Sequence, residues 1–290
     1  MWLPDLETKE TKELCKTVAK KSKGVCILAF SRGKDSLCAW LYLRKYFKRI
    51  IPVHFASYPN LKHVNETLAY YERVMSEENG EKVHILRMMS EELPLALSNM
   101  MYQLPTALNG VQKGAVKPYN KYDIFEQIRY ELSLPSAWVA FAIGESDSID
   151  RRIVCKKMGG MNKATKTFFP TFDFSRKMIY DIIQESGIKV SDEYRWTSRT
   201  LTGVVSATNN RIYKEHYPED WAVIKAMYPL AEAKTLRERI LDREHEKKRR
   251  MGILADKAED GTVNDDGSDV GTDVMTDLGM DKVIADEYAD

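Results

Sequence analysis

Residues 25–36 constrain the fold more than any other segment, because an apolar run leads directly into a small polar turn and then into helix-forming sequence. The run from Val25 to Phe30 is typical of a short strand buried on both faces. The turn supplies hydroxyls, a glycine, and Asp35 or Ser36 as a cap for the next helix. A helix start presents unpaired N–H groups and a positive dipole end. The segment therefore predicts either an anion-binding loop or an ordinary strand–turn–helix connection.

Strand and helix patterns alternate through the rest of the chain. We expect further strands over residues 49–55, 82–87 and 136–143, and helices over residues 5–22, 35–48, 61–78, 93–102, 124–132, 178–185, 220–227 and 235–250. This alternation predicts an α/β fold, a doubly wound and mostly parallel sheet flanked by helices, with a helical C-terminal extension. Residues 104–122 are rich in proline and glycine and are expected to form a loop or a lid.

Composition changes along the chain and predicts four parts. An N-terminal helix over residues 1–22 precedes a core domain over 23–205, a helical extension over 206–252 and a disordered acidic tail over 253–290. Residues 251–290 hold 12 acidic and 2 basic side chains, so the body of the chain is basic. A basic body suits a nucleotide or nucleic-acid ligand. The tail either contacts a basic partner, masks the basic body, or only increases solubility.

Other features limit the class of protein that we expect. The sequence has no apolar run of about 18 residues and no signal-like N-terminus, which predicts a cytoplasmic protein without a membrane span. Its four cysteines are scattered without a Cys-x-x-Cys pair, as is typical of reduced thiols. The sequence also lacks the ligand clusters of zinc and iron–sulfur sites, so we expect neither.

The pattern Ser-x-Gly-x-Asp-Ser over residues 31–36 resembles the pyrophosphate-binding loop of the adenine nucleotide alpha-hydrolase (PP-loop ATP pyrophosphatase) superfamily, and is not a Walker A loop. Residues 144–152, 169–183 and 187–194 resemble, in the same order, segments of its phosphoadenosine-phosphosulfate reductase-like branch. The resemblance covers residues 22–200. Three features depart from it: the branch's arginine next to Gly144 is absent, Ala-Ser-Tyr-Pro over 56–59 replaces Asp-Thr-Gly, and no cysteine follows Cys155.

The resemblance implies that the loop binds ATP or a related adenylyl nucleotide together with Mg²⁺. Its pyrophosphate-binding residues would be Ser31, Gly33 and Ser36. Lys34 would direct its charge at the phosphates or at solvent. Asp35 would orient the loop or hold Mg²⁺ through water, since Mg²⁺ prefers carboxylate and phosphate oxygens. On this basis Lys34 and Asp35 are the expected catalytic residues, and Asp35 is the expected metal ligand.

Further nucleotide contacts are expected around the loop. Arg32 would fold over the phosphates or be exposed. Ser57 and Gly144 follow two of the expected strands and would contact the nucleotide. Arg151 and Arg152 would bind phosphate or sulfate oxygens as planar forks, or would only pair with neighbouring aspartates.

The function implied by the resemblance is an enzyme, of a kind common in bacteria and phages, that cleaves ATP between its alpha and beta phosphates and adenylates a substrate. The reaction would belong to nucleic-acid modification or sulfur transfer. One alternative is a sulfonucleotide reductase, whose thiol would be Cys155, with a pKa lowered by the adjacent lysines, since Cys38 is expected in the core. Another is a non-catalytic nucleotide-binding module that binds a nucleic acid or a basic protein. His54 is either a general base or structural.

Overall fold

The computed structural model describes residues 8–104, 119–145, 147–203 and 206–233, and the single residues 236, 237, 240, 243, 244 and 247. The expected acidic tail lies outside the described residues. So do most of the expected helix over 235–250 and most of the segment 104–122 that was interpreted as a loop or lid.

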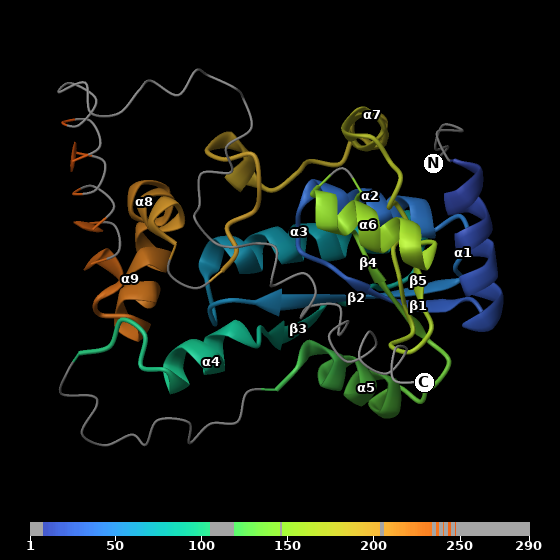
Figure 1. The fold of residues 1–290 in the computed structure, drawn as a ribbon, viewed down its shortest axis with the longest axis horizontal. Helices are drawn as coiled ribbons and strands as arrows, with labels where there is room; N and C mark the ends of the chain where they lie inside the picture. The colour runs from blue at the N-terminus through green and yellow to red at the C-terminus, as the bar shows by residue number, and fades with distance from the viewer. Residues whose placement is uncertain are drawn as a thin grey trace.

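A six-stranded sheet forms the centre of the molecule, as Figure 1 shows. The strands are β1 (Val25–Ala29), β2 (Arg49–Ala56), β3 (Leu86–Met89), β4 (Trp138–Phe141), β5 (Met161–Asn162) and β6 (Thr167–Phe168), in the spatial order β3-β2-β1-β4-β6-β5. The pairs β1–β2, β1–β4, β2–β3 and β4–β6 are parallel, and β5 pairs with β6 in the antiparallel direction. The expected α/β fold with a mostly parallel sheet is confirmed.

Helices cover both faces of this sheet. In Figure 1, α2, α3, α6 and α7 lie on one face and α4 and α5 on the other, while α1 and the α8–α9 pair lie at opposite ends of the molecule. Their bounds are α1 (Lys9–Lys21), α2 (Lys34–Leu43), α3 (Lys62–Asn79), α4 (Glu92–Ser98), α5 (Lys121–Glu131), α6 (Ile149–Met158), α7 (Arg176–Ser186), α8 (Ala207–His216) and α9 (Pro218–Met227). Within the described part of the chain, none of these helices combines the length and the apolar character needed to cross a bilayer.

The core is divided by the sheet into two apolar layers. Cys26 and Leu28 in β1 face the larger cluster, formed with α1, α2, α3 and α7, whereas Ile27 faces a smaller cluster formed with α5. All three side chains are fully buried, and full burial of such a side chain contributes about 1.5–3 kcal/mol. The apolar run before the loop is therefore a central strand, and it fixes the position of the turn that follows.

The order of the strands creates a switch point next to β1. The chain runs from β1 to β2 and β3 on one side, and then returns to place β4 on the other side of β1. In open α/β sheets, ligands bind at such points, outside the carboxyl ends of the strands. The loops after β1, β2 and β4 all emerge at this edge, and they contain the expected site residues 31–36, 57 and 144.

Several elements differ from the sequence-based predictions. Helices α6 and α8 and the β5–β6 pair were not predicted, because each is short or carries a mixed polar pattern. The third strand was predicted over 82–87 and instead begins at Leu86, where it pairs with Val53 of β2. The helix predicted from residue 35 begins at Lys34 with Gly33 as its N-cap, so the expected cap at Asp35 or Ser36 was wrong.

Candidate functional site at the end of β1

The loop between β1 and α2 is held by its own hydroxyls and amides. The backbone N–H of Gly33 donates to Ser31 Oγ at 3.3 Å, and Ser31 Oγ donates to Ser36 Oγ at 3.1 Å. Ser36 Oγ in turn donates to the carbonyl of Gly33 at 2.9 Å. These bonds fix a compact turn. In this structure both serine hydroxyls bind within the loop, and their expected bonds to phosphate stay a prediction.

The N-terminus of α2 receives its cap from a distant segment. Gly33 makes no side-chain cap bond, and the N–H of Lys34 donates instead to the hydroxyl of Tyr194 at 3.0 Å. A Cβ atom at position 33 would lie 3.2 Å from that hydroxyl, so glycine permits the close approach. A phenol that accepts one N–H still carries a proton that it can donate. Tyr194 follows Glu193 in the short 3₁₀ helix η2 (Asp192–Arg195).

Lys34 and Asp35, the first two residues of α2, form an ion pair. Lys34 Nζ lies 2.8 and 3.0 Å from the two carboxylate oxygens of Asp35, and the two side chains are 40% and 39% exposed. Burial opposes the ammonium charge, but the bond to Asp35 and the charges of Asp35, Tyr194 and Asp147 outweigh it and raise the pKa of Lys34. The site therefore holds a partly exposed cation, Lys34, whose pKa responds to the carboxylates of Asp35 and Asp147.

Arg32 is buried instead of exposed. Its side chain is 2% exposed, and Nη1 binds Glu193 Oε1 at 3.0 Å. Its φ of 68° lies in the left-handed region, which a residue with a Cβ adopts only when its surroundings enforce it. Of the two positions expected for Arg32, the exposed one is wrong, and its contact with phosphates stays a prediction. Because Glu193 binds the guanidinium, Arg32 links the loop to η2.

The remaining expected contacts lie at the same edge of the sheet with protein partners of their own. Ser57 Oγ accepts from the N–H of Gly203 at 3.1 Å, and the N–H of Gly144 donates to Asp147 Oδ2 at 3.0 Å. Arg151 Nη1 binds the same Asp147 oxygen at 2.7 Å. Arg152 Nε contacts the carbonyl of Glu145 at 3.4 Å. For Arg151, the alternative of pairing with a neighbouring aspartate is the arrangement observed.

Cysteine chemistry has no accessible thiol at this site. All four cysteines lie in the described part of the chain, all are buried, and none of them forms a disulfide. Burial raises the pKa of Cys155 to about 12, with further contributions from Glu145 and Asp147, and burial likewise raises the pKa of Cys38 far above its ordinary value. The expectation that neighbouring lysines lower the pKa of Cys155 was wrong, because burial and these acidic groups dominate.

His54 at the end of β2 is structural. It is buried, and Nδ1 donates to the carbonyl of Phe30 at 3.0 Å. Burial, followed by the charge of Arg32, lowers the pKa of His54 to about 4. A neutral ring that supports the start of the loop is therefore the role the structure gives it.

The carboxylates of the site do not form a dedicated metal cage. Among the described residues, no group of three or more His, Cys, Asp or Glu side chains is arranged to hold a metal ion. The acidic groups around Lys34 are Asp35 and Asp147. One or two carboxylates are what a Mg²⁺ ion uses when substrate phosphates supply its other ligands.

Sequence comparison finds no relative: no family model matches the chain, and no curated protein matches it. One solved structure that matches is the U34-tRNA thiolase NcsA from Methanococcus maripaludis with its 4Fe–4S cluster. The two chains are 13% identical over 77% of this chain and 79% of that chain, with a TM-score of 0.36. A likeness at this TM-score is too weak to assign the chain a family or an activity.

Proposed function

We propose that this chain binds ATP or a related adenylyl nucleotide with its phosphates against residues 31–36, and transfers the adenylyl group to an acceptor with release of pyrophosphate. The observation that carries this proposal is the position of the loop. It lies at the carboxyl end of β1, at the switch point of the sheet, and the N-terminus of α2 follows it directly. The ordered resemblance of residues 144–194 to the phosphoadenosine-phosphosulfate reductase-like branch favours an adenylyl nucleotide over other anions.

The loop offers suitable donors for a phosphate group. The N–H groups of Asp35 and Ser36 belong to the first turn of α2 and have no acceptor within the helix. Lys34 supplies a cation, and the Tyr194 hydroxyl supplies a proton next to it. The backbone N–H groups and the Tyr194 hydroxyl are in place before any ligand arrives, so they would position the phosphates with little reorganisation, whereas Lys34 is bound to Asp35.

The ion pair between Lys34 and Asp35 indicates which carboxylates could bind Mg²⁺. Asp35 and Asp147 are the carboxylates that would hold it, together with the phosphates. When bound, Mg²⁺ would neutralise phosphate charge and so ease the departure of pyrophosphate. If Asp35 turned toward the Mg²⁺ ion, Lys34 would be released from its ion pair and could bind a phosphate oxygen.

The buried cysteines favour adenylation over sulfonucleotide reduction. The reductase reaction needs a thiolate that reaches its substrate, and none of the four thiols is exposed. Adenylyl transfer needs no thiol of the protein. The acceptor, in nucleic-acid modification or sulfur transfer, is proposed from the resemblance alone.

Calorimetric titration with α,β-methylene ATP, with and without Mg²⁺, tests the site. Because a hydrogen bond to a charged group contributes about 1.5–3 kcal/mol, Lys34→Ala should weaken binding by about 10- to 100-fold. Asp35→Asn should remove most of the Mg²⁺ dependence. The control is Lys20→Ala, an exposed lysine in the last turn of α1, and this variant should bind the nucleotide as the wild type does. No binding by the wild type, or an unchanged affinity in Lys34→Ala, would refute the assignment.

Pyrophosphate release then separates an enzyme from a binding module. The wild type should release pyrophosphate from Mg²⁺-ATP when RNA, DNA or a sulfur donor is supplied as acceptor, and Asp35→Asn should not. If the nucleotide binds at the loop but no acceptor in the panel yields pyrophosphate, the non-catalytic alternative replaces the enzyme.

A further inference from the structure

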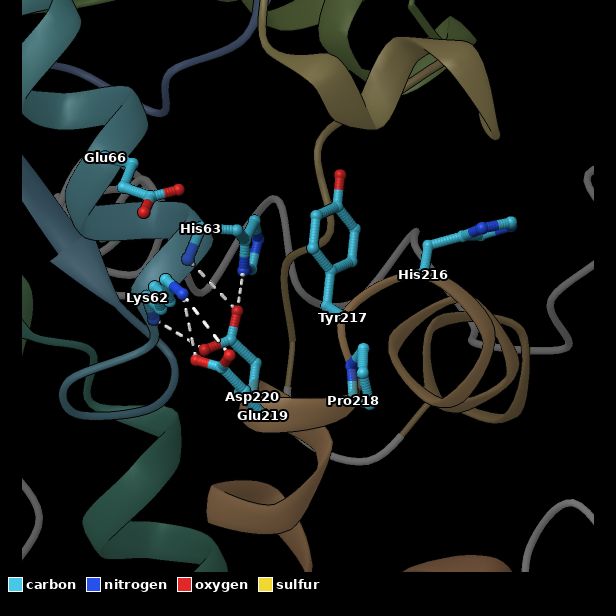
Figure 2. Close-up of a pocket in the computed structure, with 8 residues that line it drawn as sticks. All are labelled: Lys62, His63, Glu66, His216, Tyr217, Pro218, Glu219 and Asp220. Carbon is cyan, nitrogen blue, oxygen red and sulfur yellow. Dashed lines mark hydrogen bonds and ion pairs between the residues drawn. The ribbon is translucent and has the colours of Figure 1, made fainter.

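A buried network of four ionisable side chains, Arg32, Glu193, His63 and Asp220, connects the loop with α9. Arg32 binds Glu193 Oε1 at 3.0 Å, and the same oxygen lies 2.7 Å from His63 Nε2. The other ring nitrogen of His63, Nδ1, lies 2.6 Å from Asp220 Oδ2. Figure 2 shows His63 at the start of α3 facing Asp220 at the start of α9, on the wall of a pocket of about 210 Å³. This network thus joins the loop, η2, α3 and α9.

Within the network, the charge on each side chain depends on its neighbours. Both nitrogens of His63 face carboxylate oxygens, and each nitrogen donates only if the ring carries both protons. Burial opposes the charge of Glu193, but the hydrogen bonds and charges of His63 and Arg32 outweigh burial and lower the pKa of Glu193. All four side chains are buried. Removing one of the four side chains leaves its neighbours as unpaired buried charges, and this lowers the stability of the folded protein.

Asp220 has a second role at the start of α3. The N-cap of α3 is Leu61, which makes no side-chain cap bond. Asp220 supplies the missing acceptors from α9: Oδ1 accepts the N–H of Lys62 at 2.5 Å, and Oδ2 accepts the N–H of His63 at 3.1 Å. Helix α9 therefore fixes both the backbone and the ring of His63.

At its other end, the network holds the loop of residues 31–36, called here the phosphate loop. Arg32 stands between Ser31 and Gly33 with a left-handed φ, and Glu193 holds its side chain. The next residue after Glu193 is Tyr194, whose hydroxyl caps Lys34. The short helix η2 thus contacts the loop twice, through Glu193 at Arg32 and through Tyr194 at the N-terminus of α2. His63 in turn holds η2 in place through Glu193.

We propose that Glu193, His63 and Asp220 are positioning residues that hold Arg32, and with it the phosphate loop, in the shape that binds a ligand. Docking of α9 is then a condition for that shape. The identity of the ligand rests on the proposed function, but the effect on the loop is a property of the ligand-free protein.

Hydrogen–deuterium exchange of the full chain, without ligand, tests the positioning role. The variant is His63→Gln, which removes the imidazole ring and leaves one amide nitrogen where two ring nitrogens face Glu193 and Asp220. The matched control is His216→Gln, the same substitution at another histidine that lines the pocket. The ring of His216 stacks on Trp196 with 3.6 Å between the ring centroids and is not part of the buried network. We expect exchange in peptides covering residues 30–40 to rise about tenfold in His63→Gln, the equivalent of about 1.4 kcal/mol, while α1 and the control variant remain unchanged.

Two results would overturn the proposal. In the first, residues 30–40 of His63→Gln exchange at the same rate as in the wild type. In the second, exchange rises equally in every peptide of the variant, which indicates a general loss of stability. If His63→Gln does not fold, Asp220→Asn provides the same test, because it keeps one acceptor for the α3 cap. A titration with Mg²⁺ and α,β-methylene ATP separates the two proposals. A loosened loop in a protein whose wild type does not bind the nucleotide removes the proposed function and leaves the positioning role. Equal nucleotide affinity and equal loop exchange in both proteins removes the positioning role alone.

Discussion

Replacing Glu193 by glutamine should destabilise the protein more than any exposed charge change. The substitution keeps the shape of the side chain but removes the charge that faces both Arg32 Nη1, at 3.0 Å, and His63 Nε2, at 2.7 Å. At an effective dielectric constant of about 20, each contact is worth about 5–6 kcal/mol before desolvation is subtracted. Breaking a buried pair by removing one partner costs about 3–5 kcal/mol in practice, and we expect a loss in this range in the free energy of unfolding.

Urea unfolding, followed by tryptophan fluorescence and circular dichroism, measures this loss. The control is Asp192→Asn in the same short helix, where the carboxylate is 71% exposed and pairs with Arg195 at the surface. Such pairs contribute at most about 1 kcal/mol. A double-mutant cycle with Arg32→Met should show that the two changes together cost less than their sum. If Glu193→Gln unfolds at the same urea concentration as Asp192→Asn, the buried ion pair is not a stabilising feature and the reasoning fails.

Three further predictions concern the surroundings of the loop. Because the pKa of His54 is lowered to about 4, the unfolded chain binds its proton more tightly, so stability should fall by up to about 3 kcal/mol as the pH drops from about 6.5 to about 4. His54→Gln should show a shallower pH dependence in urea unfolding, and an identical slope would contradict this. Arg32→Gly should be more stable than Arg32→Ala by about 1 kcal/mol, since both lose the ion pair but only glycine adopts a φ of 68° without strain; equal stabilities would contradict the backbone geometry. The native protein should not react with a thiol-specific reagent at pH 8, because Cys155 and the other cysteines are buried, and rapid labelling of any of them would show an accessible thiol.

The sequence was sufficient for the central features of the fold because each depends on local patterns. The apolar run from Val25 to Ala29 forms the central strand, and the polar turn after it opens α2. Alternating strands and helices then required a parallel sheet, and the sheet order places residues 31–36, Ser57 and Gly144 at one edge. These positions follow from strand ends, which a sequence marks by a change from apolar to polar residues.

The buried charges could not be predicted in the same way, since they depend on contacts between distant segments. Arg32 and Glu193 are 161 residues apart, and His63 and Asp220 are 157 apart. Each side chain, viewed alone, fits an exposed position on a helix or a loop. The pKa of Cys155 was mispredicted for a related reason: it is set chiefly by burial and by acidic groups such as Glu145 and Asp147, and not by the lysines next to it in sequence. Glu193 was within reach of sequence reasoning, because it adjoins Tyr194 in a segment that the resemblance had already singled out.

A structure of the full chain with Mg²⁺ and α,β-methylene ATP tests the central claim most directly. We predict that the phosphates lie against Ser31–Ser36, within hydrogen-bond distance of Lys34 Nζ and of the N–H groups in the first turn of α2, with Asp35 turned from Lys34 toward the metal ion. A nucleotide bound elsewhere, for example in the pocket beside His63 and His216, would contradict the assignment of this loop as the nucleotide site.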